Sequence, residues 1–182
     1  HWRDYAERLG KRHGRILAKN GAGVMILDPM ASGMFSKKDF KEKMMPPARR
    51  VINEIHKNGG YTVYHVCGNT SDRIREMCET GASAIQIDTD VNLRDALETV
   101  KRFNEEHPKR PPVLVLGNFN GKNMDSMGTN EVRKRTREML KEGEPYGFFV
   151  PSTGCEIPHS VPAENIHAFV DTIKRFKRRR AA

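Results

Sequence analysis

The stretch TVYHVCGNT, residues 62–70, sets the pattern from which the fold can be inferred. Its first part, residues 62–66, is a short apolar run that indicates a buried strand, and a Gly-Asn-Thr turn ends it. His65 and Cys67 stand two positions apart at this end. Because side chains alternate along an extended strand, we expect both to point to the same face.

Four other apolar runs, at 23–28, 84–88, 112–118 and 147–152, also predict buried strands. Amphipathic stretches that predict helices alternate with the strands. They lie at 38–57, 71–79, 92–106, 129–142 and 163–178. Strands that are apolar throughout and separated by helices indicate a parallel sheet with both faces covered. The sequence therefore predicts an α/β fold of five successive βα units, and we expect one domain over residues 1–182.

The composition is that of a soluble globular protein, with 37% hydrophobic and 30% charged residues among 182. No run of 18 apolar residues and no signal peptide is apparent. Three cysteines, an odd count, argue against a disulfide framework, so we expect a cytoplasmic protein. The net charge of +9 includes a dense basic run at 174–180, which we interpret as a solvated helix end. Without a nucleic-acid motif, nucleic acid is not an expected partner, and no membrane partner is expected.

Polar residues stand at the ends of all five predicted strands. They are Asp28, His65 with Cys67, Asp88, Asn118 and Cys155. In a β/α barrel, functional groups lie at the carboxyl ends of the strands and on the following loops. An aspartate at such a position can instead cap the next helix, and this alternative stays open for Asp28 and Asp88.

The cysteines divide into two kinds. One imidazole and two thiolates, from His65, Cys67 and Cys155, form a ligand set that suits Zn²⁺ and leaves a fourth position open for chemistry. Cys78 shares a predicted helix face with Ile74 and Met77, so we expect a buried core thiol there.

Four strings carry a family resemblance. They are HVCGNT, GASAIQIDTDVNLRDA, VLGN and STGCEIPHSVPAENIHAF. They resemble the uroporphyrinogen decarboxylase superfamily, and within it the zinc-dependent methylcobamide:thiol methyltransferases, over residues 28–170. The resemblance implies a (β/α)8 TIM-barrel type of fold, of which this chain covers about the last five βα units. It also implies zinc ligation by His65, Cys67 and Cys155. Asp88 stands where the similar cobalamin-independent methionine synthases place a ligating Glu, so a fourth ligand and a loop or cap role are both open.

The resemblance further implies an enzyme, a methyltransferase that moves a methyl group from a methylcobamide to a thiol such as coenzyme M. A separate corrinoid protein would deliver the methylcobamide. Asn69, Asn118 and Asp28 are candidates to bind the substrate or the edge of the corrin, and the alternative that Asn69 and Asn118 only fix the loop backbone stays open. Two alternatives are a uroporphyrinogen decarboxylase type of lyase, which has no use for the His-Cys-Cys trio, and a non-catalytic, zinc-stabilised corrinoid-binding module.

Five βα units leave a barrel open at two strands, 23–28 and 147–152. Open edges expose unpaired backbone groups and apolar side chains. We therefore expect an oligomer, or a missing N-terminal barrel segment that completes the sheet.

Overall fold

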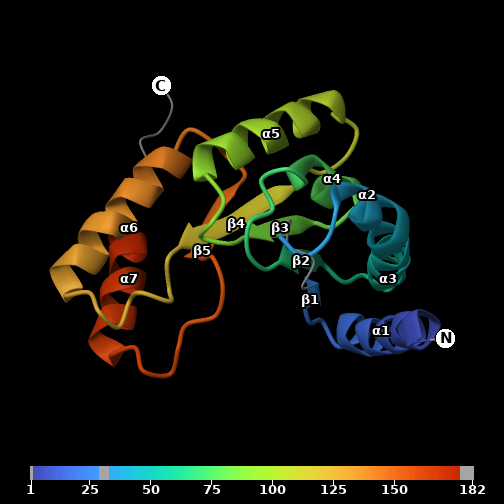
Figure 1. The fold of residues 1–182 in the computed structure, drawn as a ribbon, viewed down its shortest axis with the longest axis horizontal. Coiled ribbons are helices and arrows are strands. Elements are labelled where there is room, and N and C mark those ends of the chain that lie inside the picture. Colours follow the sequence, from blue (N-terminus) through green and yellow to red (C-terminus); the bar gives the residue numbers. More distant parts are fainter. Residues whose placement is uncertain (1, 29–32, 177–182) are drawn as a thin grey trace.

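The computed structural model describes residues 2–28 and 33–176, and over these residues it contains one sheet of five parallel strands. The strands are β1 (Val24–Asp28), β2 (Thr62–Val66), β3 (Ala84–Ile87), β4 (Leu114–Phe119) and β5 (Phe149–Thr153). Each strand pairs with the next along the chain, so β1 and β5 form the two edges (Figure 1). The five predicted strands and their edges are confirmed.

The helices form an outer arc around the strands (Figure 1). They are α1 (Trp2–Lys19), α2 (Lys37–Asp39), the π-helix η1 (Phe40–Met44), α3 (Met45–Lys57), α4 (Ile74–Glu79), α5 (Leu93–Glu106), α6 (Thr129–Gly143) and α7 (Ala163–Arg175). Right-handed crossovers between successive parallel strands place the connecting helices α3, α4, α5 and α6 on the same side of the sheet. Within the described residues, none of the helices combines the length and apolar character needed to cross a membrane.

The predicted helix over 38–57 is divided into α2, η1 and α3. Pro46 and Pro47 occupy the first positions of α3, where a residue without a backbone N–H is tolerated. The prolines cannot donate to the preceding turn, so a new helix begins here rather than a continuation of the one before. The end of the predicted helix over 163–178 lies beyond the described residues.

α1 was not predicted from the sequence. This helix packs on α3 so closely that a Cβ on Gly14 would lie 2.5 Å from the Ile55 side chain. Arg50 on α3 also donates to the Glu7 carboxylate at 2.6 Å, and this bond with that from Lys11 lowers the pKa of Glu7 to about 2. Contacts with α3 therefore hold α1 in place beside β1.

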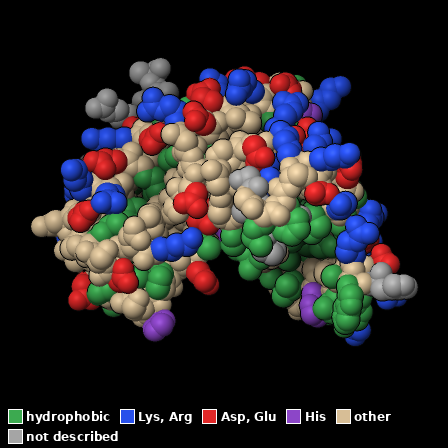
Figure 2. Space-filling view, viewed as in Figure 1, with side chains coloured by type: hydrophobic (Ala, Val, Ile, Leu, Met, Phe, Trp, Pro, Cys, Tyr) green, Lys and Arg blue, Asp and Glu red, His purple; other side chains and the backbone are tan. Residues whose placement is uncertain are grey.

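The two faces of the sheet differ in exposure. Tyr64, Ile85 and Val115 lie on the helix-covered face and are fully buried. On the opposite face, the edge residues Leu27 and Val150 are 66% and 37% exposed. On that face His65 and Gln86, in the middle of the sheet, are buried, so the prediction that both faces are covered is wrong only at the two edge strands. Figure 2 shows hydrophobic side chains gathered around β1 and along α1, beside the hollow that this face borders.

Candidate metal centre

His65 projects from β2 onto the inner face of the sheet and is only 2% exposed. Its Nδ1 lies 3.3 Å from the backbone oxygen of Gln86 on β3. A carbonyl oxygen can only accept, so Nδ1 carries the proton and the lone pair of Nε2 is free. Nε2 lies 3.1 Å from the Cys67 sulfur and 3.9 Å from the Cys155 sulfur. The same-face alternation expected for His65 and Cys67 thus brings both side chains to one point.

Cys155 comes from the loop that follows β5. The Thr153 hydroxyl donates to the Cys155 backbone oxygen at 2.7 Å, which turns the chain back toward the sheet. A Cβ on Gly154 would lie 2.6 Å from the backbone nitrogen of Thr89, so only glycine lets this loop approach the end of β3. As a result, the ligating atoms of His65, Cys67 and Cys155 all lie within 4.8 Å of one another.

The electrostatics of this trio suit a cation. Burial lowers the pKa of His65, which keeps its imidazole neutral. Burial also raises the pKa of Cys67, and a charge on the adjacent Cys155 would raise it further. Two neighbouring thiolates therefore need a positive charge to exist together. One neutral imidazole and two thiolates fit Zn²⁺ in softness and in number, with a position left open.

Asp88 directly follows β3 and is fully buried. Its oxygens accept hydrogen bonds from the backbone N–H of Gly68 at 2.7 Å and of Thr89 at 2.6 Å. Although burial favours the neutral acid, these bonds and Lys122 nearby hold the pKa of Asp88 below its usual range. Asn92, not Asp88, is the N-cap of α5. The contacts thus give Asp88 a loop role, in which it fixes the turn after Cys67; its ligation of zinc stays a prediction.

Gln86 on β3 is a site residue that was not predicted from the sequence. Its side-chain nitrogen donates to the Thr153 oxygen at 3.0 Å and to the Ser152 hydroxyl at 3.3 Å. Its backbone oxygen also accepts the proton of His65 Nδ1. The same residue therefore orients His65 and holds the strand that leads to Cys155. Its only sequence signal is that it is the polar residue inside an otherwise apolar strand.

Asn118 and Asn69 make local backbone contacts. The Asn118 amide donates to the backbone oxygen of Val91 at 2.7 Å and so holds the loop between β3 and α5. Asn69 is exposed and accepts from the backbone N–H of Ser71 at 3.0 Å. Both lie at the carboxyl edge of the sheet, and their substrate-binding role stays a prediction.

Asp28 lies on the opposite face from His65. It pairs in register with Val66, and its carboxylate accepts from the Tyr64 hydroxyl at 2.8 Å. Burial raises the pKa of Asp28 against the opposing effect of this hydrogen bond. Ser36, not Asp28, caps α2. The structure therefore does not bring Asp28 to the metal centre, and its substrate-binding role also stays a prediction.

The strand order and the carboxyl-edge position of the trio define a β/α-barrel protein, and comparison with known proteins identifies its family. The chain belongs to the uroporphyrinogen decarboxylase (URO-D) family, whose model matches residues 7–176. It is 26% identical over 177 residues to the "Methylcobamide:CoM methyltransferase MtbA" of Methanosarcina acetivorans, and 25% identical to that of Methanosarcina mazei. Each match covers 96% of this chain and 48% of the relative. The predicted family is confirmed.

A uroporphyrinogen decarboxylase of Anaeromyxobacter dehalogenans is 23% identical over 145 residues, 79% of this chain and 38% of that protein. Among solved structures, a methyltransferase from Methanosarcina mazei superposes with a TM-score of 0.77 at 18% identity, over 94% of this chain and 47% of that one. The chain thus spans about half the length of the relatives it matches. These matches confirm the predicted fold, a barrel of which this chain forms one part.

Proposed function

We propose that this chain supplies the metal centre of a zinc-dependent methyltransferase, which moves a methyl group from a methylated corrinoid to a thiol. The observation that carries the proposal is the convergence of His65 Nε2 with the sulfurs of Cys67 and Cys155 within 4.8 Å. Two methylcobamide:CoM methyltransferases among the relatives support the corrinoid donor and a thiol acceptor such as coenzyme M. A corrinoid protein is the partner that this function requires.

In this function, His65, Cys67 and Cys155 would hold the zinc. When bound, zinc would supply the positive charge that ionises a substrate thiol near neutral pH. The two cysteine thiolates donate electron density, which keeps a neighbouring sulfur nucleophilic. Gln86 holds the Nδ1 proton of His65 in place, so that Nε2 keeps its lone pair available for ligation.

The remaining side chains shape the approach to the centre. Asn69 and Asn118 offer neutral amides at the same edge of the sheet, suited to orient a polar thiol or the edge of a corrin. Asp88 carries a negative charge beside the trio, balanced by Lys122 at 3.9 Å. Because the charges of Asp88 and Lys122 are opposite, the net charge of this pair is close to zero before the substrate binds.

A decarboxylase is the second candidate, because a uroporphyrinogen decarboxylase is among the relatives. That reaction needs cationic groups for several substrate carboxylates and gives the His-Cys-Cys trio no task. The inner face near His65 instead presents apolar residues, Leu27, Leu116 and Val150. The cation named beside the trio, Lys122, already lies 3.9 Å from the Asp88 carboxylate. The trio therefore favours methyl transfer.

The test combines metal analysis with a single-turnover assay. The purified protein should hold about one zinc per chain and demethylate methylcobalamin in the presence of a thiol, with coenzyme M first in a panel. Cobalt substitution should give a spectrum that changes when the thiol is added, which shows an open ligand position. A chain that binds no zinc would contradict the proposal. A cobalt spectrum that thiols leave unchanged would favour the non-catalytic module.

A further inference from the structure

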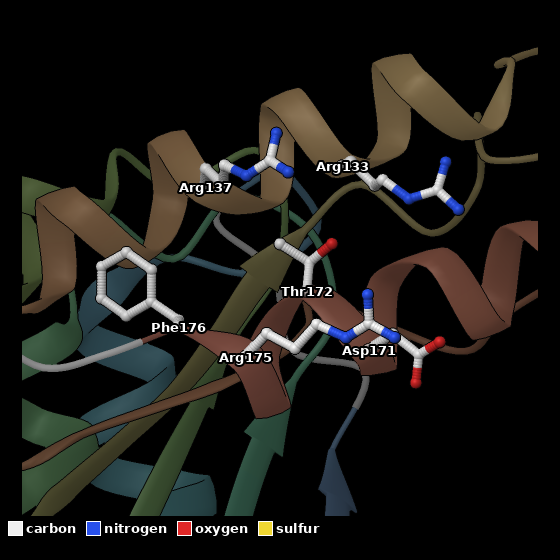
Figure 3. Close-up of a pocket in the computed structure, with 6 residues that line it drawn as sticks. All are labelled: Arg133, Arg137, Asp171, Thr172, Arg175 and Phe176. Atoms are coloured by element: carbon white, nitrogen blue, oxygen red, sulfur yellow. The ribbon is translucent and has the colours of Figure 1, made fainter.

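A cavity of about 370 Å³ lies between α6 and α7, in the outer helix layer. Its lining residues come from both helices: Arg133 and Arg137 from α6, and Asp171, Thr172 and Arg175 from α7 with Phe176 at its end. Figure 3 shows the arginine side chains of both helices beside one groove. None of these residues takes part in the candidate metal centre, so the groove is a separate feature.

The charges in this groove are not balanced within the described chain. Three guanidinium groups face one carboxylate, and none of the three arginines forms an ion pair with a described residue. Arg133 has a neutral contact, a hydrogen bond of 3.2 Å to the side-chain oxygen of Asn130. Arg135, two positions further along α6, instead binds the Glu131 carboxylate at 2.6 Å. The groove therefore holds an excess of guanidinium donors, whereas the neighbouring arginine is paired.

Guanidinium groups are suited to phosphate. Each presents a planar fork of N–H donors that matches two phosphate oxygens, and it stays charged at every physiological pH. A phosphate monoester carries a charge between −1.5 and −2 at pH 7, roughly the excess of three arginines over Asp171. Asp171 would repel a polyanion, but it can accept a hydrogen bond from a hydroxyl or amino group. The half-buried ring of Phe176 adds an apolar wall.

We propose that this groove binds a small phosphate monoester. The phosphate lies among Arg133, Arg137 and Arg175, and the organic part lies against Phe176 with a hydroxyl or amino group on Asp171. The proposal does not depend on the metal centre or on the proposed methyl transfer. It gives the basic outer face of α6 and α7 a role distinct from that of a solvated helix end.

Calorimetric titration of the full chain with adenosine monophosphate tests this proposal. We expect saturable binding, weaker binding of inorganic phosphate and none of adenosine. Arg137→Gln and Arg175→Gln should each weaken adenosine monophosphate binding about tenfold, since each removes a charge-assisted hydrogen bond. The matched control is Arg135→Gln on the same helix, which removes the same charge outside the groove and should change affinity less than twofold. Circular dichroism checks that each variant is folded.

Three outcomes would overturn the proposal. One is an equal loss of affinity in Arg135→Gln, which would mean that net charge alone attracts the anion. A second is an affinity for inorganic phosphate equal to that for adenosine monophosphate, because the organic part of the ligand would then make no contact. The third is that a single-stranded oligonucleotide binds and adenosine monophosphate does not. The groove between α6 and α7 would then be a nucleic-acid site. Zinc content should be the same in all variants, which keeps this test independent of the metal centre.

Discussion

Cys78 and Cys67 are eleven positions apart in the chain, yet their surroundings differ in almost every respect. Cys78 lies on α4, is 1% exposed and packs in the core between helices and sheet. Cys67 lies just beyond β2, is half-buried and has an imidazole nitrogen 3.1 Å from its sulfur. The comparison teaches that the position on a strand end, rather than the residue type, makes a thiol available for chemistry.

The largest expected effect is on metal content. Cys67→Ala and Cys155→Ala should each lose most of the bound zinc, because two remaining ligands cannot hold a tetrahedral ion tightly. Cys78→Ala is the matched control and should keep about one zinc per chain. Mass spectrometry of the metal in purified protein measures this. Full zinc retention in Cys155→Ala would remove that residue from the ligand set.

A smaller loss is expected for Gln86→Leu, which keeps the side-chain size but removes the contacts to Thr153 and Ser152. Zinc affinity should fall roughly tenfold, as it does when a group that supports a metal ligand is lost. Competition with a chromogenic chelator measures the affinity. In the Cys155→Ala background, Gln86→Leu should have almost no further effect, because its side chain acts through the segment that carries Cys155. An undiminished effect in that background would show that Gln86 acts elsewhere.

Asp88→Asn should weaken zinc affinity by about 10- to 100-fold, since the charge beside the trio is lost. The asparagine has one acceptor oxygen where the aspartate uses two, so it can keep the bond from the N–H of Gly68 only if it loses the bond from the N–H of Thr89. The chelator competition again gives the affinity, and thermal unfolding gives the stability. Unchanged zinc affinity together with a lower melting temperature would restrict Asp88 to its loop role.

The smallest effect concerns thiol reactivity. Burial raises the pKa of Cys78 to about 12, so at pH 8 roughly one chain in ten thousand carries its thiolate. In metal-free protein at pH 8, iodoacetamide should therefore label Cys67 and Cys155 but leave Cys78 unmodified, as peptide mass spectrometry would show. Rapid labelling of Cys78 in folded protein would contradict its core position.

The same burial makes stability depend on alkaline pH. An unfolded cysteine ionises near pH 8.5, whereas folded Cys78 keeps its proton to about pH 12. The unfolded chain thus binds fewer protons above pH 8.5, and the free energy of unfolding falls as the pH rises. Cys78→Ala should lack this part of the alkaline loss in urea titrations at pH 8 and pH 10.

Much of this architecture was predictable because its signals are local. Apolar runs alternating with amphipathic stretches specify the strands, and their polar ends place His65, Cys67 and Cys155 at one edge. α1 was harder to predict, because Gly10 and Gly14 lower its helix propensity. The reason for these glycines is their close contact with α3, which the sequence does not show. The role of Gln86 depends on the register of β2 with β3 and on a contact that crosses β4. Neither the register nor such a contact is visible in a single sequence.

The position of Cys155 after the last strand has a consequence in polymer terms. His65 and Cys155 are separated by 90 residues, and three βα crossovers lie between them. A metal ion held by both residues would close a loop of that length in the unfolded chain as well. If the ion stayed bound there, the lost chain entropy would stabilise the fold by about 4–5 kcal/mol, by analogy with a disulfide that closes a similar loop. The metal centre would then link β2 to the segment after β5. When a chelator removes the metal, β5 and α7 should become mobile before the rest of the fold.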